Sequence, residues 1–274
     1  MLPSQPIRIL ETIITEMIKR EYLEQLRKEF VHYTNQFTSN DFFVQRHFGV
    51  KQEHTFRVCE CIVEIGKRLE LNEDQLLIAE TIALLHDIGR FEQYKQYQTF
   101  SDFESTDHAT LGVQVINELG LLNDIDPNTK SLVTKAILNH NKPVLKDDKD
   151  DVTFYSKLIR DADKLDIFRV VKEYEQLESN LGVQDDKKYK IPDFILNAFT
   201  RHQTVSYKDV KSRNDMTLLR VSWIFDINFH PTFQLLDQRD YLNHFLNLIP
   251  KSYRLINIQE IVRNYTVEKI FSYA

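Results

Sequence analysis

The stretch LLIAETIALLHDIGRF, residues 76–91, decides the fold. Its first part, Leu76 to Leu85, is apolar enough to form a buried helix. Asn72 precedes this run as a good N-cap residue, because its side chain can accept a hydrogen bond from the first turn. Gly89 is expected to end the helix. The stretch therefore predicts a buried helix that begins near Asn72.

Apolar stripes with helical spacing lie on both sides of this helix. One follows His54 with steps of four, three and four residues. Gly and Pro, which punctuate turns, number only 6 and 7, and their scarcity favours long helices over many short strands. The charged segment from Ile7 to Phe30 is also helix-friendly. LLRVSWIFDINF, residues 218–229, has a strand-like composition, but its length and neighbours favour a buried helix. We therefore expect an all-α fold.

Two polar stretches interrupt the helical pattern, Lys146 to Asp151 and Ser179 to Lys190. Both are typical of solvated loops, although the second could cover the mouth of an active site. The sequence contains no internal repeat and no low-complexity tract. We therefore expect a single helical domain over residues 1–274, with a core at about 48–171 and a helical elaboration at 172–274.

The composition is that of an ordinary globular protein, with 42% hydrophobic and 28% charged residues. A net charge of −6 argues against a surface that coats nucleic acid, without excluding a small basic pocket. Cys59 and Cys61 point to different sides of a helix and lack a second pair for a zinc cluster, so we expect both to be reduced. The chain shows neither a signal peptide nor a membrane span, which favours the cytoplasm.

Five predicted helices direct metal-capable side chains toward the core. His54, for example, lies four residues before Val58 on an apolar stripe. The full set of inward positions is His54, His86, Asp87, His108, His140 and Asp163. A single histidine of this kind is usually a hydrogen-bonded core residue. A buried carboxylate, however, is costly unless it has a partner, and one divalent cation can pair with several such groups at once.

Four of these residues follow an order that resembles the H…HD…D signature of the HD-domain phosphohydrolase superfamily: His54, His86, Asp87 and Asp163. The local sequences EHTFRV, ALLHDIGRFEQ and IRDADKLDIFR carry the resemblance, which covers roughly Phe48 to Val171. It implies that the four residues bind one divalent ion. Such an ion lowers the pKa of its water and polarises a phosphoryl oxygen, and Asp87 could also steer the nucleophile.

His108 and His140 extend the resemblance to an H…HD…H…H…D variant, in which some members hold two ions. Each histidine could bind the second metal, could instead donate to a substrate phosphate around one ion, or could be structural. The GYP motif of the cyclic-dinucleotide phosphodiesterases in this group is absent, which counts against a cyclic dinucleotide as the substrate. The expected cofactor is one or two divalent ions, with Mn, Fe, Ni, Co, Mg and Zn as candidates.

Arg90 lies one turn after His86, where many superfamily members carry Lys and HD-type 5′-nucleotidases usually carry Glu. Its planar guanidinium suits a phosphate contact, and a surface arginine at a helix carboxyl terminus is the alternative. We predict that Asp87 and Arg90 are catalytic and that Arg90 also binds substrate. The missing Glu weakens an assignment as a deoxynucleoside monophosphatase.

Further polar residues could support the site. Asp107 and Asp166 could orient metal-binding histidines, although Asp107 could equally cap a helix. Lys164 is expected to pair with a surface acid. Lys211 and Arg213, in YKDVKSRNDM, could reach the pocket and bind a second phosphate or a base, although a solvated loop is the simpler interpretation.

The sequence therefore predicts a metal-dependent hydrolase of phosphomono- or phosphodiesters, acting on a nucleotide-like small molecule. One alternative is a di-iron oxygenase, because inositol-type oxygenases share the H…HD…H…H…D ligand order. Another is a regulatory module that senses a nucleotide without turnover. The complete ligand set argues against that module, because degenerate HD modules tend to lose ligands.

Overall fold

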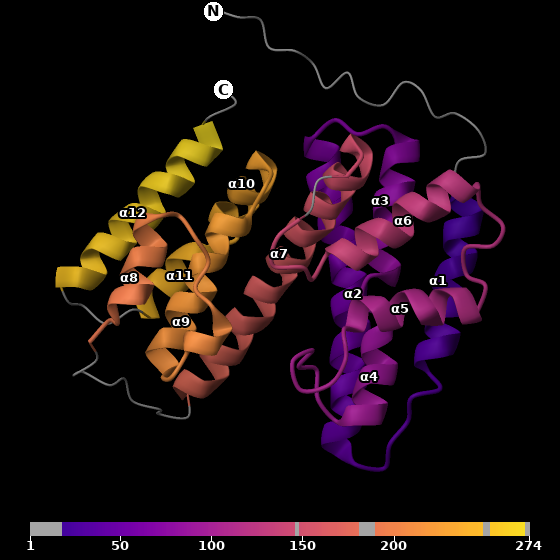
Figure 1. Ribbon diagram of the computed structural model, residues 1–274, viewed down its shortest axis with the longest axis horizontal. Helices are drawn as coiled ribbons and strands as arrows, with labels where there is room; N and C mark the ends of the chain where they lie inside the picture. The colour runs from indigo at the N-terminus through magenta and orange to yellow at the C-terminus, as the bar shows by residue number, and fades with distance from the viewer. Residues whose placement is uncertain (1–17, 146–147, 181–189, 249–252, 272–274) are drawn as a thin grey trace, which may run out of the picture. The chain divides into compact units, whose positions relative to one another are not determined.

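The computed structural model describes residues 18–145, 148–180, 190–248 and 253–271. Every regular element in these residues is a helix, which confirms the all-α prediction. The chain divides into two compact units, Met1–Asp163 and Lys164–Ala274. Helix α7 (Asp150–Asn180) begins in the first unit and continues into the second (Figure 1). The single domain over residues 1–274 stays a prediction.

The described part of the first unit holds six complete helices besides the start of α7. They are α1 (Arg20–Thr34), α2 (Phe42–Arg68), α3 (Glu73–Leu85), α4 (Gly89–Tyr97), α5 (His108–Glu118) and α6 (Pro127–Asn139).

Helix α3 lies in the core of this unit because apolar residues cover most of its surface. The four residues from Ile82 to Leu85 are fully buried. A capping box holds its amino terminus: the Asn72 side chain accepts from the backbone N–H of Gln75 at 3.0 Å, and the Gln75 side chain accepts from that of Asn72 at 2.9 Å. The predicted buried helix and its N-cap are both confirmed.

The predicted helix end at Gly89 is wrong. Helix α3 ends at Leu85, His86 is its C-cap, and Gly89 instead begins α4. A glycine is needed there for close packing, because a Cβ atom would lie 2.3 Å from the carbonyl oxygen of His108 and 2.4 Å from the backbone nitrogen of Gly112. This close approach brings the first residue of α5 beside the turn that follows α3.

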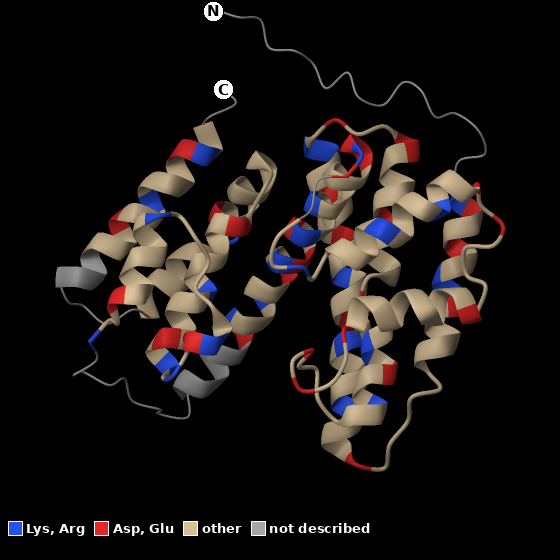
Figure 2. Ribbon diagram, in the orientation of Figure 1, with Lys and Arg blue, Asp and Glu red and all other residues tan. Residues whose placement is uncertain are grey.

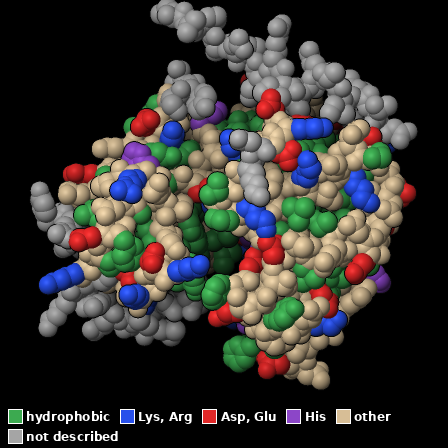
Figure 3. Space-filling model, viewed as in Figure 1, with side chains coloured by type: hydrophobic (Ala, Val, Ile, Leu, Met, Phe, Trp, Pro, Cys, Tyr) green, Lys and Arg blue, Asp and Glu red, His purple; other side chains and the backbone are tan. Residues whose placement is uncertain are grey.

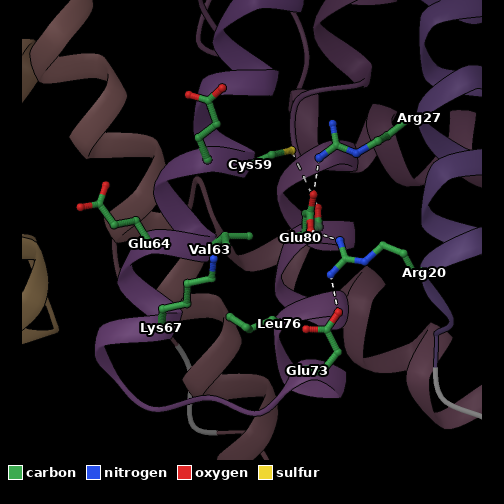
Figure 4. A pocket seen from close by; sticks show the side chains of 10 residues that line it. Arg20, Arg27, Cys59, Val63, Glu64, Lys67, Glu73, Leu76 and Glu80 are labelled. Atoms are coloured by element: carbon green, nitrogen blue, oxygen red, sulfur yellow. Dashed lines mark hydrogen bonds and ion pairs between the residues drawn. The ribbon is translucent and has the colours of Figure 1, made fainter.

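Charged side chains connect α1 to α3 (Figure 4). The Glu80 carboxylate on α3 is only 9% exposed, and it accepts from Arg20 at 3.1 Å and from Arg27. Arg20 also pairs with Glu73 at 2.5 Å. A buried carboxylate requires such partners, so these ion pairs hold α1 against the core helix. The arginines that line the pocket drawn in Figure 4 are therefore already paired with carboxylates.

The second unit packs aromatic side chains between the rest of α7 and the helices that follow it. Phe168 of α7 contacts Trp223 and Phe245, with ring centroids at 6.0 and 5.6 Å. The helices of its described residues are α8 (Asp193–Thr200), η1 (Tyr207–Asp209), α9 (Arg213–Ser222), η2 (Trp223–Asp226), α10 (His230–Gln238), α11 (Tyr241–Leu248) and α12 (Tyr253–Phe271).

The helix predicted over residues 218–229 is correct only in its first part. Helix α9 ends at Ser222, the short 3₁₀ helix η2 follows, and Ile227 is extended. The Ser222 side chain donates to the carbonyl oxygen of Leu219 at 2.6 Å and accepts from the backbone N–H of Val205 at 2.8 Å. Such side-chain bonds compete with helical hydrogen bonding at the residue where α9 ends.

The predicted loops agree with the structure only in part. Asp150 and Asp151 already belong to α7, as do Ser179 and Asn180 at its other end. Residues 146–147 and 181–189, which fill the middle of the two polar stretches, lie outside the described residues, as does the part of the amino-terminal segment before residue 18.

Positive and negative side chains are interspersed along the helices of both units (Figure 2). The face drawn in Figure 3 shows the same mixture among hydrophobic side chains. Cys59 and Cys61 are both buried, and neither forms a disulfide with a described residue, as expected of reduced cysteines. In the described ranges, no helix combines the length and the apolar character that a membrane crossing requires.

Candidate metal centre

The carboxylate of Asp87 lies between two pairs of buried histidines, all within the first unit. On one side, the Nε2 atoms of His54 and His86 each lie 3.8 Å from its Oδ2. Asp163 adds a second carboxylate to this pair, with its Oδ1 at 3.0 Å from His54 Nε2 and 3.8 Å from His86 Nε2. These four residues form the first half of the site.

His108 and His140 form the second half. Their Nε2 atoms lie 3.3 and 3.8 Å from Oδ1 of Asp87, the oxygen that faces away from the first pair. Each half therefore groups two imidazoles with one oxygen of the shared Asp87, with ligand atoms within 4.8 Å of one another. The structure brings together all six residues that the sequence predicted as metal ligands.

Hydrogen bonds at Nδ1 orient three of the histidines. His86 Nδ1 lies 2.7 Å from the carbonyl oxygen of Ala83, and His140 Nδ1 lies 2.6 Å from that of Ile137. A carbonyl oxygen only accepts, so each Nδ1 carries the proton and each Nε2 has a free lone pair. Metal-binding histidines have this arrangement, with the second ring nitrogen donating to the protein.

The second histidine pair is arranged so that it could hold a cation. His108 Nδ1 donates to Asp102, so the Nε2 lone pairs of His108 and His140 face each other at 2.9 Å. Two lone pairs at this distance repel unless a proton or a metal ion lies between or beside them. Burial lowers the pKa of His108 to about 4, which disfavours the proton at neutral pH. A metal ion satisfies both nitrogens.

The first pair gives a similar indication. Nε2 of His86 is fully buried and has no hydrogen-bond partner among the described residues. Buried polar atoms are rarely left in this condition. His86 and His140 are also the C-cap residues of α3 and α6, and the negative ends of helix dipoles favour cations. Both features suit a bound cation better than an empty polar core.

Asp102, in the loop between α4 and α5, orients His108 and was missed by the sequence analysis. Its oxygens lie 2.8 and 2.6 Å from His108 Nδ1. They also accept from Arg90 at 3.0 Å, Gln93 at 2.9 Å and Asn141 at 3.0 Å. Four donors from different parts of the first unit therefore converge on one carboxylate.

The structure corrects the roles proposed for Asp107. Asp107 is the N-cap of α5: its side chain accepts from the backbone N–H of Thr110 at 2.9 Å and pairs with Lys142. The capping alternative is therefore the correct one. The pKa of Asp107 falls to about 2 because bonds from Lys142 and Thr110 outweigh the opposing effect of burial.

Two cationic side chains complete the surroundings of Asp87. Lys51 Nζ lies 2.8 Å from its Oδ2, and Arg90 Nε lies 3.3 Å from its Oδ1. Burial alone would raise the pKa of Asp87, but nearby positive charge, above all Lys51, holds it well below its usual range. Lys51 was missed, although it lies three residues before His54 and so on the same helix face.

Arg90 does not occupy the helix carboxyl terminus of the alternative interpretation. It is the second residue of α4, and its side chain is only 15% exposed. Its Nη1 donates to the carbonyl oxygen of Phe100 at 2.6 Å as well as to Asp102. Arg90 therefore connects Asp87 to Asp102, and its contact with a phosphate stays a prediction.

A buried arginine, Arg160, contacts the backbone of His140. Arg160 Nη1 donates to the carbonyl oxygens of His140 at 3.0 Å and Lys142 at 2.5 Å. These carbonyls follow α6 and have no helical partner, so the guanidinium satisfies them. The imidazole is thus held from both its ring and its backbone.

The remaining predicted residues lie in the second unit. Lys164 pairs with Asp226 at 2.7 Å, which confirms the expected acidic partner. Asp166 is buried on α7. Lys211 donates its backbone N–H to Asp215 at 3.0 Å, and Arg213 begins α9. Roles for Asp166, Lys211 and Arg213 at the site stay predictions.

Comparison with known proteins agrees with this geometry. Residues 52–167 match the family model of the HD domain, and they include all six clustered residues. No curated protein and no solved structure matches the chain. HD domains bind divalent metals, and the buried histidines and aspartates are compatible with that property. Residues 52–167 therefore form an HD domain.

Proposed function

We propose that this protein is a metal-dependent phosphohydrolase that holds two divalent ions on either side of Asp87. The observation that carries the proposal is the arrangement of the two histidine pairs around the two oxygens of this one carboxylate. His54, His86 and Asp163 would hold one ion, and His108 and His140 the other. Mixed imidazole and carboxylate donors suit Mn, Fe, Co, Ni or Zn better than Mg.

A bound divalent ion supplies a water of lowered pKa and polarises a phosphoryl oxygen. The residues of the chain do the rest. Asp87 would be a ligand in both halves of the site. Lys51 and Arg90 contact Asp87 in the structure, and both are placed to contact the anionic phosphate of a substrate. The substrate class that we propose is a small phosphomono- or phosphodiester, nucleotide-like in character.

The test combines elemental analysis with an activity panel. The purified protein is analysed for metal, stripped by chelation, and assayed on phosphomono- and phosphodiesters with Mn, Fe, Co, Ni, Zn or Mg added back. Asp87→Asn is the site variant, and His32→Ala, which removes an exposed histidine of α1, is the matched control. We expect wild type and His32→Ala to hydrolyse at least one ester only with metal, and folded Asp87→Asn to be inactive.

Other outcomes would contradict the proposal. Full turnover after verified metal removal would exclude a metal-dependent reaction. Bound iron with a visible absorption band and oxygen consumption, but no phosphate release, would indicate an oxygenase. Tight nucleotide binding without turnover in any metal would indicate a sensing module.

A further inference from the structure

The cation that contacts Asp87 also contacts an aromatic ring. Lys51 Nζ lies 2.8 Å from Asp87 Oδ2 and 5.4 Å from the ring centroid of Phe100. The ring and the carboxylate are thus no farther apart than the sum of these distances, a span that a sugar can bridge. The Lys51 side chain is 21% exposed, so the ammonium has access to solvent.

Phe100 belongs to a cluster of three rings, which we call the aromatic cluster: His47, Tyr94 and Phe100. His47 stacks on Tyr94 with centroids 4.8 Å apart, and Phe100 lies 4.6 Å from Tyr94 and 5.9 Å from His47. His47 lies one turn before Lys51 on α2, so the two share a helix face. The aromatic cluster therefore lies beside Lys51, the cation that contacts Asp87.

Part of this cluster faces solvent. Tyr94 is buried, and its ring packs against the ring of Phe48 in the core, with the two ring centroids 5.6 Å apart. His47 is exposed and Phe100 is half-buried. Tyr94 is thus the core member of the cluster, whereas the His47 ring and part of the Phe100 ring reach solvent beside a charged site. Exposed rings next to a phosphate-binding centre are suited to stack against the flat face of a ligand.

We propose that the two rings of the aromatic cluster that reach solvent, exposed His47 and half-buried Phe100, bind the purine or pyrimidine base of the substrate, and that Lys51 contacts its phosphate. This inference rests on the proposed function and deepens it, because it assigns the substrate to base-containing phosphoesters. Lys51 lies between the carboxylate and the ring, so one ligand can meet both. Stacking contributes about 1–3 kcal/mol per base, which corresponds to about 5–150-fold in affinity.

The test compares ligands with and without a base. Adenosine 5′-monophosphate and uridine 5′-monophosphate share the phosphate and sugar of ribose 5-phosphate and differ in the base. Their dissociation constants are measured by calorimetry on the metal-loaded Asp87→Asn protein if it retains metal, or otherwise on wild type with a non-catalysing ion. Turnover of each compound by wild type is measured separately.

The variants are His47→Ala, Phe100→Leu and Lys51→Gln, with His32→Ala as the control and a thermal melt for each. We expect the nucleotides to bind at least fivefold more tightly than ribose 5-phosphate. His47→Ala and Phe100→Leu should remove this difference without weakening ribose 5-phosphate. Lys51→Gln should weaken all three ligands together, because each carries the phosphate.

Equal affinity of nucleotides and ribose 5-phosphate for wild type, or absence of nucleotide binding, would overturn the proposal even if simple phosphoesters are hydrolysed. A preference for nucleotides that survives both ring substitutions would also overturn it. If nucleotides bind through these rings but no ester is hydrolysed in any metal, the base site stands and the proposed hydrolase activity fails. The two inferences are therefore tested separately.

Discussion

Replacement of Asp102 by Asn should weaken one metal position selectively. Asp102 contacts no predicted metal ligand except His108, whose Nδ1 donates to it at 2.6 Å. Asparagine preserves the shape, but one carboxylate oxygen becomes an amide that donates. Arg90 and Gln93 both require an acceptor at Oδ1, so the amide nitrogen should take the Oδ2 position. There it meets two other donors, His108 Nδ1 and the amide of Asn141. His108 then keeps only the 2.8 Å contact with Oδ1, an acceptor that it shares with Arg90 and Gln93.

The magnitude follows from the role of this bond. His108 loses its shorter bond and the full negative charge of its partner, so the tautomer that directs the Nε2 lone pair toward His140 is less strongly favoured. Loss of an outer partner of a metal-binding histidine typically reduces metal affinity by about 10–100-fold, or about 1.4–2.7 kcal/mol. The ion held by His54, His86 and Asp163 keeps its ligands. We therefore expect two ions per chain in wild type and only one tightly bound ion in Asp102→Asn.

The assay is a metal titration against a competing chelator, with elemental analysis after dialysis. Asp107→Asn is the matched control, because it removes a carboxylate of the same loop region while asparagine still caps α5. It should keep wild-type metal affinity. Unchanged metal content in Asp102→Asn, or an equal loss in Asp107→Asn, would refute the reasoning.

Three further predictions concern the fold. Gly89→Ala places a methyl group 2.3 Å from a backbone carbonyl and should lower the free energy of unfolding in urea by about 1–3 kcal/mol or more; an unchanged midpoint would contradict the close packing. Glu80→Gln weakens both ion pairs to α1 and should cost about 1–3 kcal/mol, whereas an exposed control such as Glu53→Gln should cost little. Burial raises the pKa of Cys59 to about 12, above the value of about 8.5 in the unfolded chain. The stability that the folded protein gains by keeping this thiol protonated is therefore complete below pH 8.5 and is lost as the pH rises toward 12. The native protein should resist thiol reagents at pH 8 until denaturant is added, and rapid labelling would disprove the burial.

The inward positions of the proposed ligands were predictable because helical periodicity indicates which side of a helix a residue faces. His54, His108 and Asp163 lie on apolar stripes, and a polar residue in such a position requires a partner. The N-cap at Asn72 was equally local, since capping depends on neighbouring residues alone. The family match over residues 52–167 agrees with this interpretation.

Other features depend on tertiary contacts that local sequence does not encode. Asp102 lies in an irregular loop, where no periodicity indicates its direction, whereas the adjacent Asp107 was the more obvious partner for His108. Gly89 resembles a helix stop, but its role is the approach of α4 to α5. Lys51 alone carried a usable signal, because its spacing from His54 places both residues on the same side of α2.

Anomalous diffraction from crystals grown with Mn or Zn would locate the two metal ions that we propose on either side of Asp87. We expect two peaks about 3.5–4 Å apart, as in other two-metal phosphoester sites. One peak should lie at His54, His86 and Asp163, the other at His108 and His140, with an Asp87 oxygen bound to each. A single fully occupied peak, with the imidazoles of His108 and His140 bound to no ion in metal-replete crystals, would contradict it.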